Sequence, residues 1–552
     1  MMTQIFDTPV LIVGGGPVGL GLALDLAWRG NRSMVIERDP ATGAVLLAKA
    51  NGLHERTMET IRRWGLKDEV ARVGFPPDLP ADSVYCTTMT GHYIGQSVLP
   101  STNTRPTPPE SPEKRQRCPQ YEFDPMLARA VESRGLTDIL YNTEFVSAEQ
   151  DAEGVSVKVR DVVSGEERSL RTRYLIGCDG AGSRVRRSLG IEFEGRMLDF
   201  SLSAMIRIPE IPKDRLVAEG ERYLLIDTGG TWGIMTQVDG REIWRYTVVG
   251  SQDKLDPAKY DIAQDIRKAL GPAEVDFEIL RILPWRRSQC VAASYRESRI
   301  LLAGDSAHTT SPTGGHGMNT GIADAVDLSW MLDALLKGWG GDHLLEAYDL
   351  ERRPVGVRNS AKAAENYSGW MENSGYEKIL LDGPEGDAAR ADIGARLVAA
   401  LNGEWNSLGV NLGYRYEGSP IIIPDGSAAT LDETTHYIQT ARPGHRAPHA
   451  WMKDGRSTLD LFGQGFTLLR FDAALDCGAL EYAAKAVGMP LCVVDIDDAA
   501  IAALYERPLV LVRPDGQSAW RGEAVPADAA AVIDVVRGAR TRVAMHDEER
   551  AA

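Results

Sequence analysis

Three glycines near the start of the chain have the spacing G-x-G-x-x-G, which lets a backbone approach the phosphates of a dinucleotide. They are Gly14, Gly16 and Gly19, and Pro17 and Val18 lie between the last two. Gly14 allows a tight turn, Gly16 has no Cβ to hold a pyrophosphate away, and Gly19 lets a helix pack closely on a strand. A helix that begins here would direct unpaired N–H groups and its positive dipole end toward the phosphates.

The residues around these glycines supply the elements that such a site needs. The apolar run 10–13 precedes them, the Leu- and Ala-rich run 20–28 follows, and the apolar run 33–36 ends at Glu37 and Arg38. This order predicts a strand, a turn, a helix and a second strand, with the Glu37 carboxylate placed to accept hydrogen bonds from a ribose. The sequence therefore predicts a Rossmann-like unit that binds a dinucleotide.

A second stretch begins with the apolar residues 174–177 and continues as Cys178, Asp179 and Gly180. It predicts a buried strand that runs into a turn. Because Asp-Gly is common in turns, this stretch carries little weight by itself.

A third stretch joins an apolar strand, residues 299–303, to Gly304, Asp305 and a glycine-rich loop. The loop contributes Pro312, Gly315, Gly317, Met318 and Asn319. We expect a helix over about 318–336, whose first N–H groups would face the edge of an electron-rich ring. Asp305 would accept hydrogen bonds from a ribose or ribitol hydroxyl, or cap the following helix. Met318 would pack on a flat ring or in the core.

The composition narrows the class of protein. The chain has 552 residues, which predicts two to four domains, and a formal charge of -17, which argues against nucleic acid or an anionic membrane as a partner. No run approaches the roughly 18 apolar residues of a membrane span, and no signal peptide is expected. The six cysteines form no C-x-x-C pair, so no metal site is predicted. These features indicate a cytoplasmic enzyme with free thiols.

The distribution of strand and helix patterns predicts an α/β protein with several domains. Apolar and polar residues alternate through 199–249, which is typical of an antiparallel sheet. Two prolines mark expected helix boundaries: Pro125 follows an N-cap at Asp124, and Pro354 separates one helix from the next. The predicted domains are a dinucleotide-binding part over 1–195 with an excursion at about 76–118, a β-sheet substrate domain over 196–290, the second dinucleotide-binding part with long helices over 291–420, and a small α/β domain over 421–552.

The three stretches, in this order and with a β-rich insert between the second and third, resemble the single-component FAD-dependent aromatic hydroxylases. These are the phenol or para-hydroxybenzoate hydroxylase-like flavoprotein monooxygenases, and the resemblance covers nearly the whole chain. It implies a Rossmann-like FAD-binding domain, an inserted antiparallel β-sheet substrate domain and a C-terminal thioredoxin-like α/β domain. Arg513-Pro514-Asp515-Gly516 is typical of that last domain. Because this domain has no C-x-x-C pair, a redox role is not expected for it. A role in packing or dimerisation is expected instead.

The resemblance also implies roles for the residues already singled out. The first glycines and Glu37 would hold the ADP half of FAD, Asp179 would serve both FAD and NAD(P)H, Asp305 would hold the ribitol side, and the loop 312–319 would lie along the isoalloxazine. Gln120 stands where the family often has a glutamine that contacts the flavin. Lys49 stands where many members have arginine, and it keeps the charge but loses the bidentate fork.

The implied reaction begins when NAD(P)H, binding transiently, reduces FAD. Dioxygen then forms a C4a-hydroperoxide, and a phenolate or another electron-rich ring of a small aromatic substrate attacks its distal oxygen. Water then leaves, and the flavin is restored. A base that ionises the phenol would help, and His54, Tyr223, Arg245 and Tyr246 are candidates by location only. A homodimer is expected from the resemblance.

Two alternatives remain open from the sequence. The same motifs serve hydroxylases that tailor polycyclic aromatic natural products, and a non-catalytic flavin-binding regulator is a candidate from a different class. A flavin halogenase is disfavoured, because the sequence lacks a W-x-W-x-I-P segment.

Overall fold

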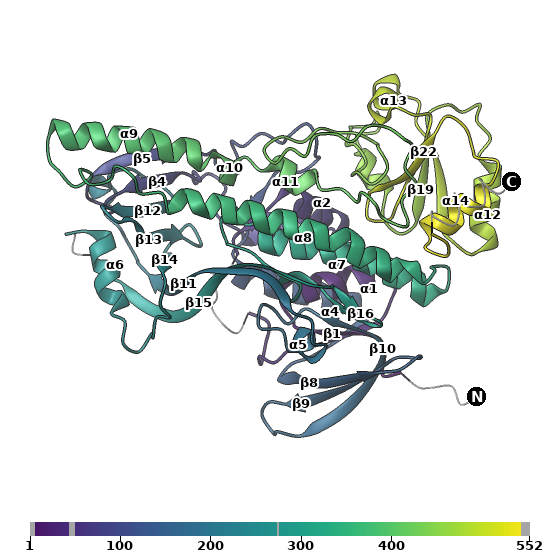
Figure 1. Ribbon diagram of the computed structural model, residues 1–552, viewed down its shortest axis with the longest axis horizontal. Helices are drawn as coiled ribbons and strands as arrows, with labels where there is room; N and C mark the ends of the chain where they lie inside the picture. The colour runs from purple at the N-terminus through teal and green to yellow at the C-terminus, as the bar shows by residue number, and fades with distance from the viewer. Residues whose placement is uncertain (1–5, 44–49, 273–274, 542–552) are drawn as a thin grey trace.

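The computed structural model describes residues 6–43, 50–272 and 275–541. Within these ranges the strands form three larger sheets and one short pair, with helices packed between and around them (Figure 1). The short pair joins β3 (Gly52–Leu53) to β6 (Gln116–Arg117).

The first sheet has a parallel centre in the order β17-β10-β1-β2-β7, with β16 beside β17 and the hairpin β8–β9 attached to β10. Helix α1 (Pro17–Trp28) packs between this sheet, α4 and α7. The strands are β1 (Thr8–Val13), β2 (Ser33–Ile36), β7 (Thr137–Leu140), β8 (Thr143–Gln150), β9 (Val155–Asp161), β10 (Glu167–Gly177), β16 (Arg296–Glu297) and β17 (Ile300–Leu302).

The second sheet is largely antiparallel and has the order β18-β15-β11-β14-β13-β12-β4-β5. One face carries an apolar core against α6 (Ile262–Leu270), and the other faces α8 and α9. The strands are β4 (Ser83–Cys86), β5 (Tyr93–Ser97), β11 (Phe193–Arg207), β12 (Arg222–Asp227), β13 (Gly230–Gln237), β14 (Ile243–Ser251), β15 (Glu278–Ala292) and β18 (His308–Thr309).

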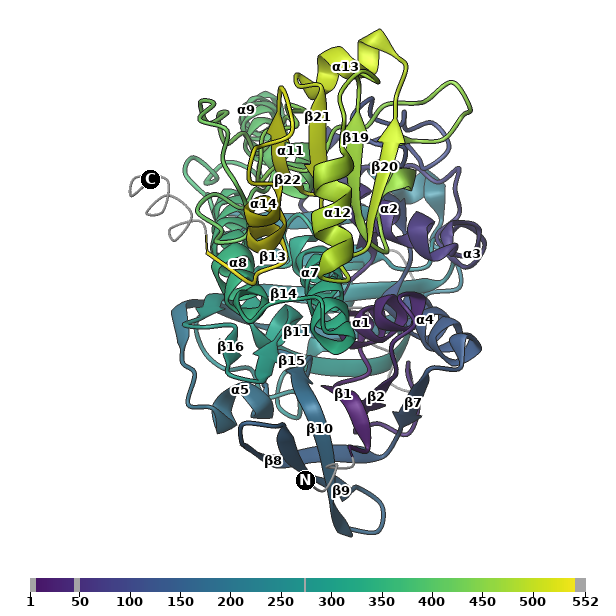
Figure 2. The ribbon, with the colours of Figure 1, turned by 90° about the vertical axis from the view of Figure 1, so that its right-hand side faces the viewer.

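The third sheet belongs to the C-terminal part of the chain and has the order β20-β19-β21-β22. Figure 2 shows this part, in yellow and yellow-green, above α1 and α7. Its strands are β19 (Phe466–Arg470), β20 (Leu491–Asp495), β21 (Leu509–Val512) and β22 (Ser518–Gly522), and its helices are α12 (Gly478–Ala486), α13 (Ala499–Tyr505) and α14 (Ala529–Val536). The three sheets confirm the predicted fold class.

Long helices connect the three sheets. Helix α8 begins beside the C-terminal part and ends at the second sheet, so it spans much of the molecule (Figure 1). The remaining helices are α2 (Glu55–Trp64), α3 (Lys67–Val73), α4 (Gln120–Arg134), α5 (Arg184–Ser188), α7 (His316–Lys337), α8 (His343–Trp370), α9 (Pro384–Ala400), α10 (Asn402–Trp405) and α11 (Leu408–Leu412). Within the described ranges, no helix is long and apolar enough to cross a membrane.

Both prolines expected at helix boundaries lie inside helices instead. Helix α4 begins at Gln120, so Asp124 is not its N-cap and Pro125 removes one hydrogen bond from the second turn. Helix α8 continues through Pro354 without a break. Pro354 is exposed, as is Leu350, whose carbonyl would have been its partner, so water can satisfy the oxygen that proline leaves free.

Candidate active site

The turns singled out in the sequence lie at one edge of the first sheet. The strands β17, β10, β1 and β2 are adjacent and parallel, and the turns at Gly304, Asp179, Gly14 and Glu37 follow their carboxyl ends in that order. This edge is where ligands bind in open α/β sheets. The backbone joins neighbouring turns, since Gly14 N donates to Ile36 O at 2.8 Å and Cys178 N donates to Val13 O at 2.8 Å.

The three glycines of the first turn differ in their surroundings. Gly14 has φ +111°, and a Cβ atom there would lie 2.5 Å from Cys178 O. A Cβ on Gly19 would collide with the carbonyl oxygen of Gly14, so the helix lies directly on the turn. Gly16 is the N-cap of α1, and a Cβ there would have nothing within 4 Å. Open space therefore remains where a pyrophosphate could approach the helix N-terminus.

Glu37 closes the first turn. Its Oε2 accepts from Gly15 N at 2.6 Å and its Oε1 accepts from Asp39 N at 2.9 Å. Pro17 and Val18 form the start of α1, and Arg38 is exposed beside Glu37. Lys49 lies outside the described residues.

The carboxylate of Asp179 is already occupied by a helix start. It accepts from Ser183 Oγ at 2.5 Å, from Arg184 N at 2.6 Å and from Val185 N at 3.1 Å. Asp179 thus holds α5 against the end of β10, which is a structural task independent of any cofactor.

Asp305 lies between the third turn and the start of α7. Gly304 has φ +63° and its amide donates to Asp324 Oδ2 at 3.0 Å. The exposed Asp305 carboxylate lies 3.9 Å from where a Cβ of Gly317 would be. The structure therefore brings Asp305 to the N-terminus of α7, as the sequence order suggested.

The loop before α7 is fixed by Asn319. Its Oδ1 accepts from His54 N at 2.8 Å and from Thr57 Oγ1 at 2.7 Å, and its Nδ2 donates to Gly52 O at 3.0 Å and Gly315 O at 2.7 Å. Helix α7 begins at His316, slightly before the predicted start. Pro312 and Gly315 are exposed on this loop, and Met318 packs partly against the core.

Two neutral histidines lie beside this loop. The rings of His54 and His316 meet edge to face, with centroids 5.3 Å apart. Burial, followed by the charge of Arg115, lowers the pKa of His54 well below its usual value and that of His316 to about 3. Neither ring nitrogen of His54 has a hydrogen bond of good geometry among the described residues, although Gly314 and Asn411 lie close enough to raise its pKa in part.

Gln120 begins α4, just after β6 of the short pair β3–β6. Its backbone N donates to Ala50 O at 3.0 Å, while its side chain donates to Asp124 Oδ2 at 2.9 Å.

The two predicted tyrosines are not brought to these turns. Tyr223 and Tyr246 belong to the apolar core between the second sheet and α6, and Tyr223 donates to Ala218 O at 2.9 Å. Arg245 is adjacent to Tyr246 in β14 and therefore projects from the opposite face. Burial, with repulsion from Arg222 and Arg287, lowers the pKa of Arg245 to about 10.

A buried carboxylate that the sequence did not reveal joins the second sheet to the loop 312–319. Glu404 in α10 accepts from Arg222 Nη1 at 2.6 Å, from Trp370 Nε1 at 3.0 Å and from Gly314 N at 3.4 Å. Arg222 stacks on Trp405, 4.3 Å from the ring centroid. No local motif marks Glu404, because its partners come from distant parts of the chain.

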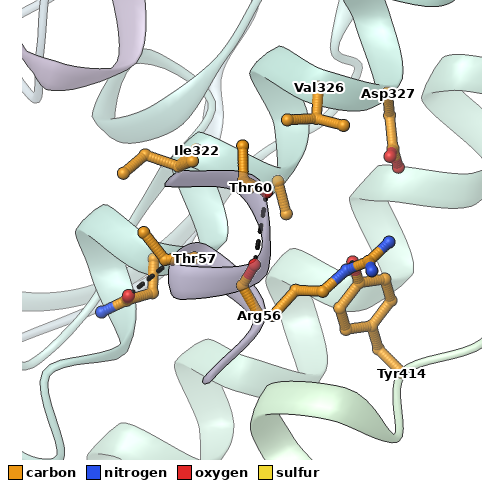
Figure 3. A pocket seen from close by; sticks show the side chains of 9 residues that line it. Arg56, Thr57, Thr60, Ile322, Val326, Asp327 and Tyr414 are labelled. Atoms are coloured by element: carbon orange, nitrogen blue, oxygen red, sulfur yellow. Dashed lines mark hydrogen bonds between the residues drawn. The ribbon is translucent and has the colours of Figure 1, made fainter. Parts of the chain in front are cut away.

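A small cavity lies behind Asn319, between α2, α7 and Tyr414 (Figure 3). Its volume of about 10 Å³ suits a single water molecule rather than an aromatic ring. A larger hollow of about 370 Å³ lies between β11 and α8, where Tyr367 is part of its wall. Tyr367 connects this hollow to the loop before α7. Arg287 lies over the ring of Tyr367 and donates to Ser311 Oγ at 3.1 Å.

Comparisons with known proteins agree with this geometry. Residues 7–363 match the family described as FAD binding domain, and residues 440–539 match aromatic-ring hydroxylase, C-terminal. The chain is 33% identical to 4-methyl-5-nitrocatechol 5-monooxygenase of Burkholderia sp, over 97% of this chain and 98% of that protein. It is 32% identical to tetracenomycin B2 monooxygenase-dioxygenase of Streptomyces olivaceus, over 96% and 98%.

A solved structure extends the likeness to three dimensions. The rebeccamycin biosynthetic enzyme RebC with reduced flavin has a TM-score of 0.89 and 37% identity, covering 97% of this chain and 99% of that chain. The chain therefore belongs to the FAD-dependent aromatic-ring hydroxylases, a family of flavoprotein monooxygenases.

Proposed function

We propose that this enzyme hydroxylates a phenolic ring, with FAD bound along the edge formed by the four turns and NAD(P)H as a transient reductant. The single observation that carries the proposal is the convergence of these turns at the carboxyl ends of adjacent parallel strands. The relatives named above support it, because each is named as a monooxygenase or holds a reduced flavin.

The described residues fit FAD. The open space at Gly16 would admit the pyrophosphate, Glu37 would accept from the ribose, and the exposed Asp305 would accept from the ribitol. When bound, the flavin would supply the chemistry: it would take electrons from NAD(P)H and activate dioxygen, so that one oxygen atom enters the phenol and the other leaves as water. The N-terminus of α7 would stabilise negative charge at the ring edge.

We assign the polar contact with the substrate hydroxyl to His54 rather than to either tyrosine. Its buried, neutral ring lies beside the loop that would carry the isoalloxazine. An imidazole with so low a pKa is a weak base, so we expect it to accept a hydrogen bond from the phenol and orient it. Tyr223 and Tyr246 are separated from this loop by the second sheet.

A polycyclic aromatic natural product is the second candidate substrate. Two of the relatives support it, since one is named for tetracenomycin B2 and the other for rebeccamycin biosynthesis. A non-catalytic regulator finds no support among the relatives named here, all of which are enzymes.

The proposal is tested with the FAD-loaded enzyme, a panel of phenols, nitrocatechols and polycyclic phenols, and ¹⁸O₂. We expect substrate-stimulated NAD(P)H oxidation, one ¹⁸O atom in the product, and a transient hydroperoxyflavin spectrum when the reduced enzyme meets oxygen. Oxidation that yields only hydrogen peroxide with every substrate would contradict it.

We also propose that the enzyme is a cytoplasmic homodimer. Six free cysteines fit a reducing compartment, and sedimentation at several concentrations tests the dimer.

A further inference from the structure

The turn Arg513–Gly516 joins β21 to β22 in the C-terminal part but is buried against helices of the FAD-binding part. Arg513 is fully buried, and its Nη1 and Nη2 donate to the two carboxylate oxygens of Glu351 in α8 at 2.6 and 2.9 Å. Asp515 Oδ2 accepts from Trp330 Nε1 of α7 at 2.9 Å. This turn therefore contacts both of the long helices that follow the flavin loop.

The next residue of α8 continues the contacts toward the flavin turns. Arg352 is fully buried; its Nε donates to Asp324 Oδ1 at 2.7 Å and its Nη2 to Thr320 O at 3.1 Å. The other oxygen of Asp324 accepts from Gly304 N at 3.0 Å and contacts His308 Nε2 at 2.8 Å. Two buried ion pairs on neighbouring residues of α8, Glu351 with Arg513 and Arg352 with Asp324, thus connect the turn Arg513–Gly516 to the amide of Gly304.

A second route leads to the other side of the site. Arg56 of α2 donates from Nη2 to Asp515 O at 2.5 Å. His54 and Thr57, at the start of the same helix, hold Asn319. The turn Arg513–Gly516 therefore contacts α2 and α7, whose first turns meet at Asn319, and α8, which holds Asp324 through Arg352.

Packing alone does not account for this arrangement. Burying paired charges costs desolvation that an apolar interface of the same size would avoid, whereas removing one partner of such a pair is strongly destabilising. Fully paired networks also restrict a core to one geometry. The described contacts therefore favour a role in which the buried ion pairs fix the relative positions of α7 and α8, rather than one in which they strengthen the attachment of the C-terminal part.

We propose that the turn Arg513–Gly516 is a positioning element of the FAD site, which holds α8 so that Arg352 and Asp324 fix the Gly304–Asp305 turn. This inference rests on the proposed binding of FAD at that turn. It gives the C-terminal domain a task in cofactor binding that needs no cysteine pair.

The test compares Arg513→Met with the matched control Arg521→Met. Arg521 is also buried and paired, but its partners Asp425 and the partly exposed Glu506, at 2.6 and 2.8 Å, both lie in the C-terminal part. Apoprotein of each variant is titrated with FAD, and its thermal unfolding is recorded without flavin. We expect FAD affinity to fall about tenfold in Arg513→Met and less than about twofold in Arg521→Met, when both are measured below the onset of thermal unfolding of each apoprotein.

Two further variants keep the test decisive if Arg513→Met does not fold. Glu351→Gln keeps the shape and one oxygen acceptor, and Arg513→Lys keeps the charge without the fork, so both should weaken FAD binding by a smaller factor. Equal FAD affinities for the Arg513, Glu351 and Arg521 variants would overturn the inference. Wild-type protein that binds no FAD would instead refute the proposed function itself.

Discussion

Val18 packs directly on Gly304, so that a Cβ atom on Gly304 would lie 2.8 Å from Cγ2 of Val18. Gly321 lies against the same methyl group: a Cβ atom on Gly321 would lie 2.6 Å from Cγ2 of Val18. The first glycine turn, the third glycine turn and helix α7 therefore share one contact point. Motifs far apart in the sequence therefore meet at one place in the fold.

We predict that Gly16→Ala separates cofactor binding from folding. The new methyl group enters open space in the apoprotein, so stability should change by at most about 1 kcal/mol. It would occupy the approach of the pyrophosphate, and FAD affinity should fall at least about tenfold. Fluorescence titration with FAD and unfolding of the apoprotein measure the two effects.

Gly19→Ala is the contrasting variant, because its methyl group would collide with the Gly14 carbonyl. It should destabilise the apoprotein itself by about 1–3 kcal/mol. Equal loss of apoprotein stability in Gly16→Ala and Gly19→Ala would contradict the assignment of the open space at Gly16.

We predict that Asn319→Ala loosens the flavin loop. The change leaves the amide of His54 and the hydroxyl of Thr57 without their acceptor, at a cost of about 1–3 kcal/mol. Hydroxylation should become uncoupled, with more hydrogen peroxide formed per NAD(P)H. Asn373→Ala is the control: the exposed Asn373 donates from Nδ2 to Gly229 O at 3.2 Å, far from this loop in the sequence, and its loss should change neither quantity.

We predict an acid-dependent loss of stability from Asp25 in α1. Burial raises its pKa, but Arg63, Arg29 and hydrogen bonds from Ser329 and Trp64 outweigh burial and lower it to about 2, from 3.8. Because the folded pKa is the lower one, the stabilisation is complete above pH 4 and disappears as the pH falls toward 2. The shift corresponds to about 2.5 kcal/mol. Asp25→Asn should flatten the free energy of unfolding against pH in this window, and an unchanged slope would contradict the prediction.

We predict that Tyr223→Phe and Tyr246→Phe leave kcat within about twofold, because both hydroxyls lie in the core against α6. His54→Leu should lower coupled hydroxylation at least about tenfold. Since the pKa of His54 is far below 6.5, no step in the pH–rate profile between pH 6 and 8 should come from it. Initial rates at saturating substrate test all three variants.

Local signals in the sequence predict the strands, the glycine turns and the helix start at one edge of the first sheet, but not the groups that face this edge. A strand, a glycine turn and a helix start are set by neighbouring residues, and α1 indeed extends from Pro17 to Trp28. The alternation in 199–249 indicates that the sheet has two faces, but not which face α6 covers. The sequence alone therefore cannot separate Tyr223 and Tyr246, which face α6, from Arg245, which faces the other side. Glu404 reaches the loop only through tertiary contacts.

The most direct test of the account is a calorimetric titration of the wild-type apoprotein with FAD. The four turns predict one FAD per chain, with a yellow complex whose flavin spectrum is that of a bound isoalloxazine. A folded apoprotein that takes up no FAD, or that binds it as tightly after Gly16→Ala, would contradict the claim that these turns form one flavin site.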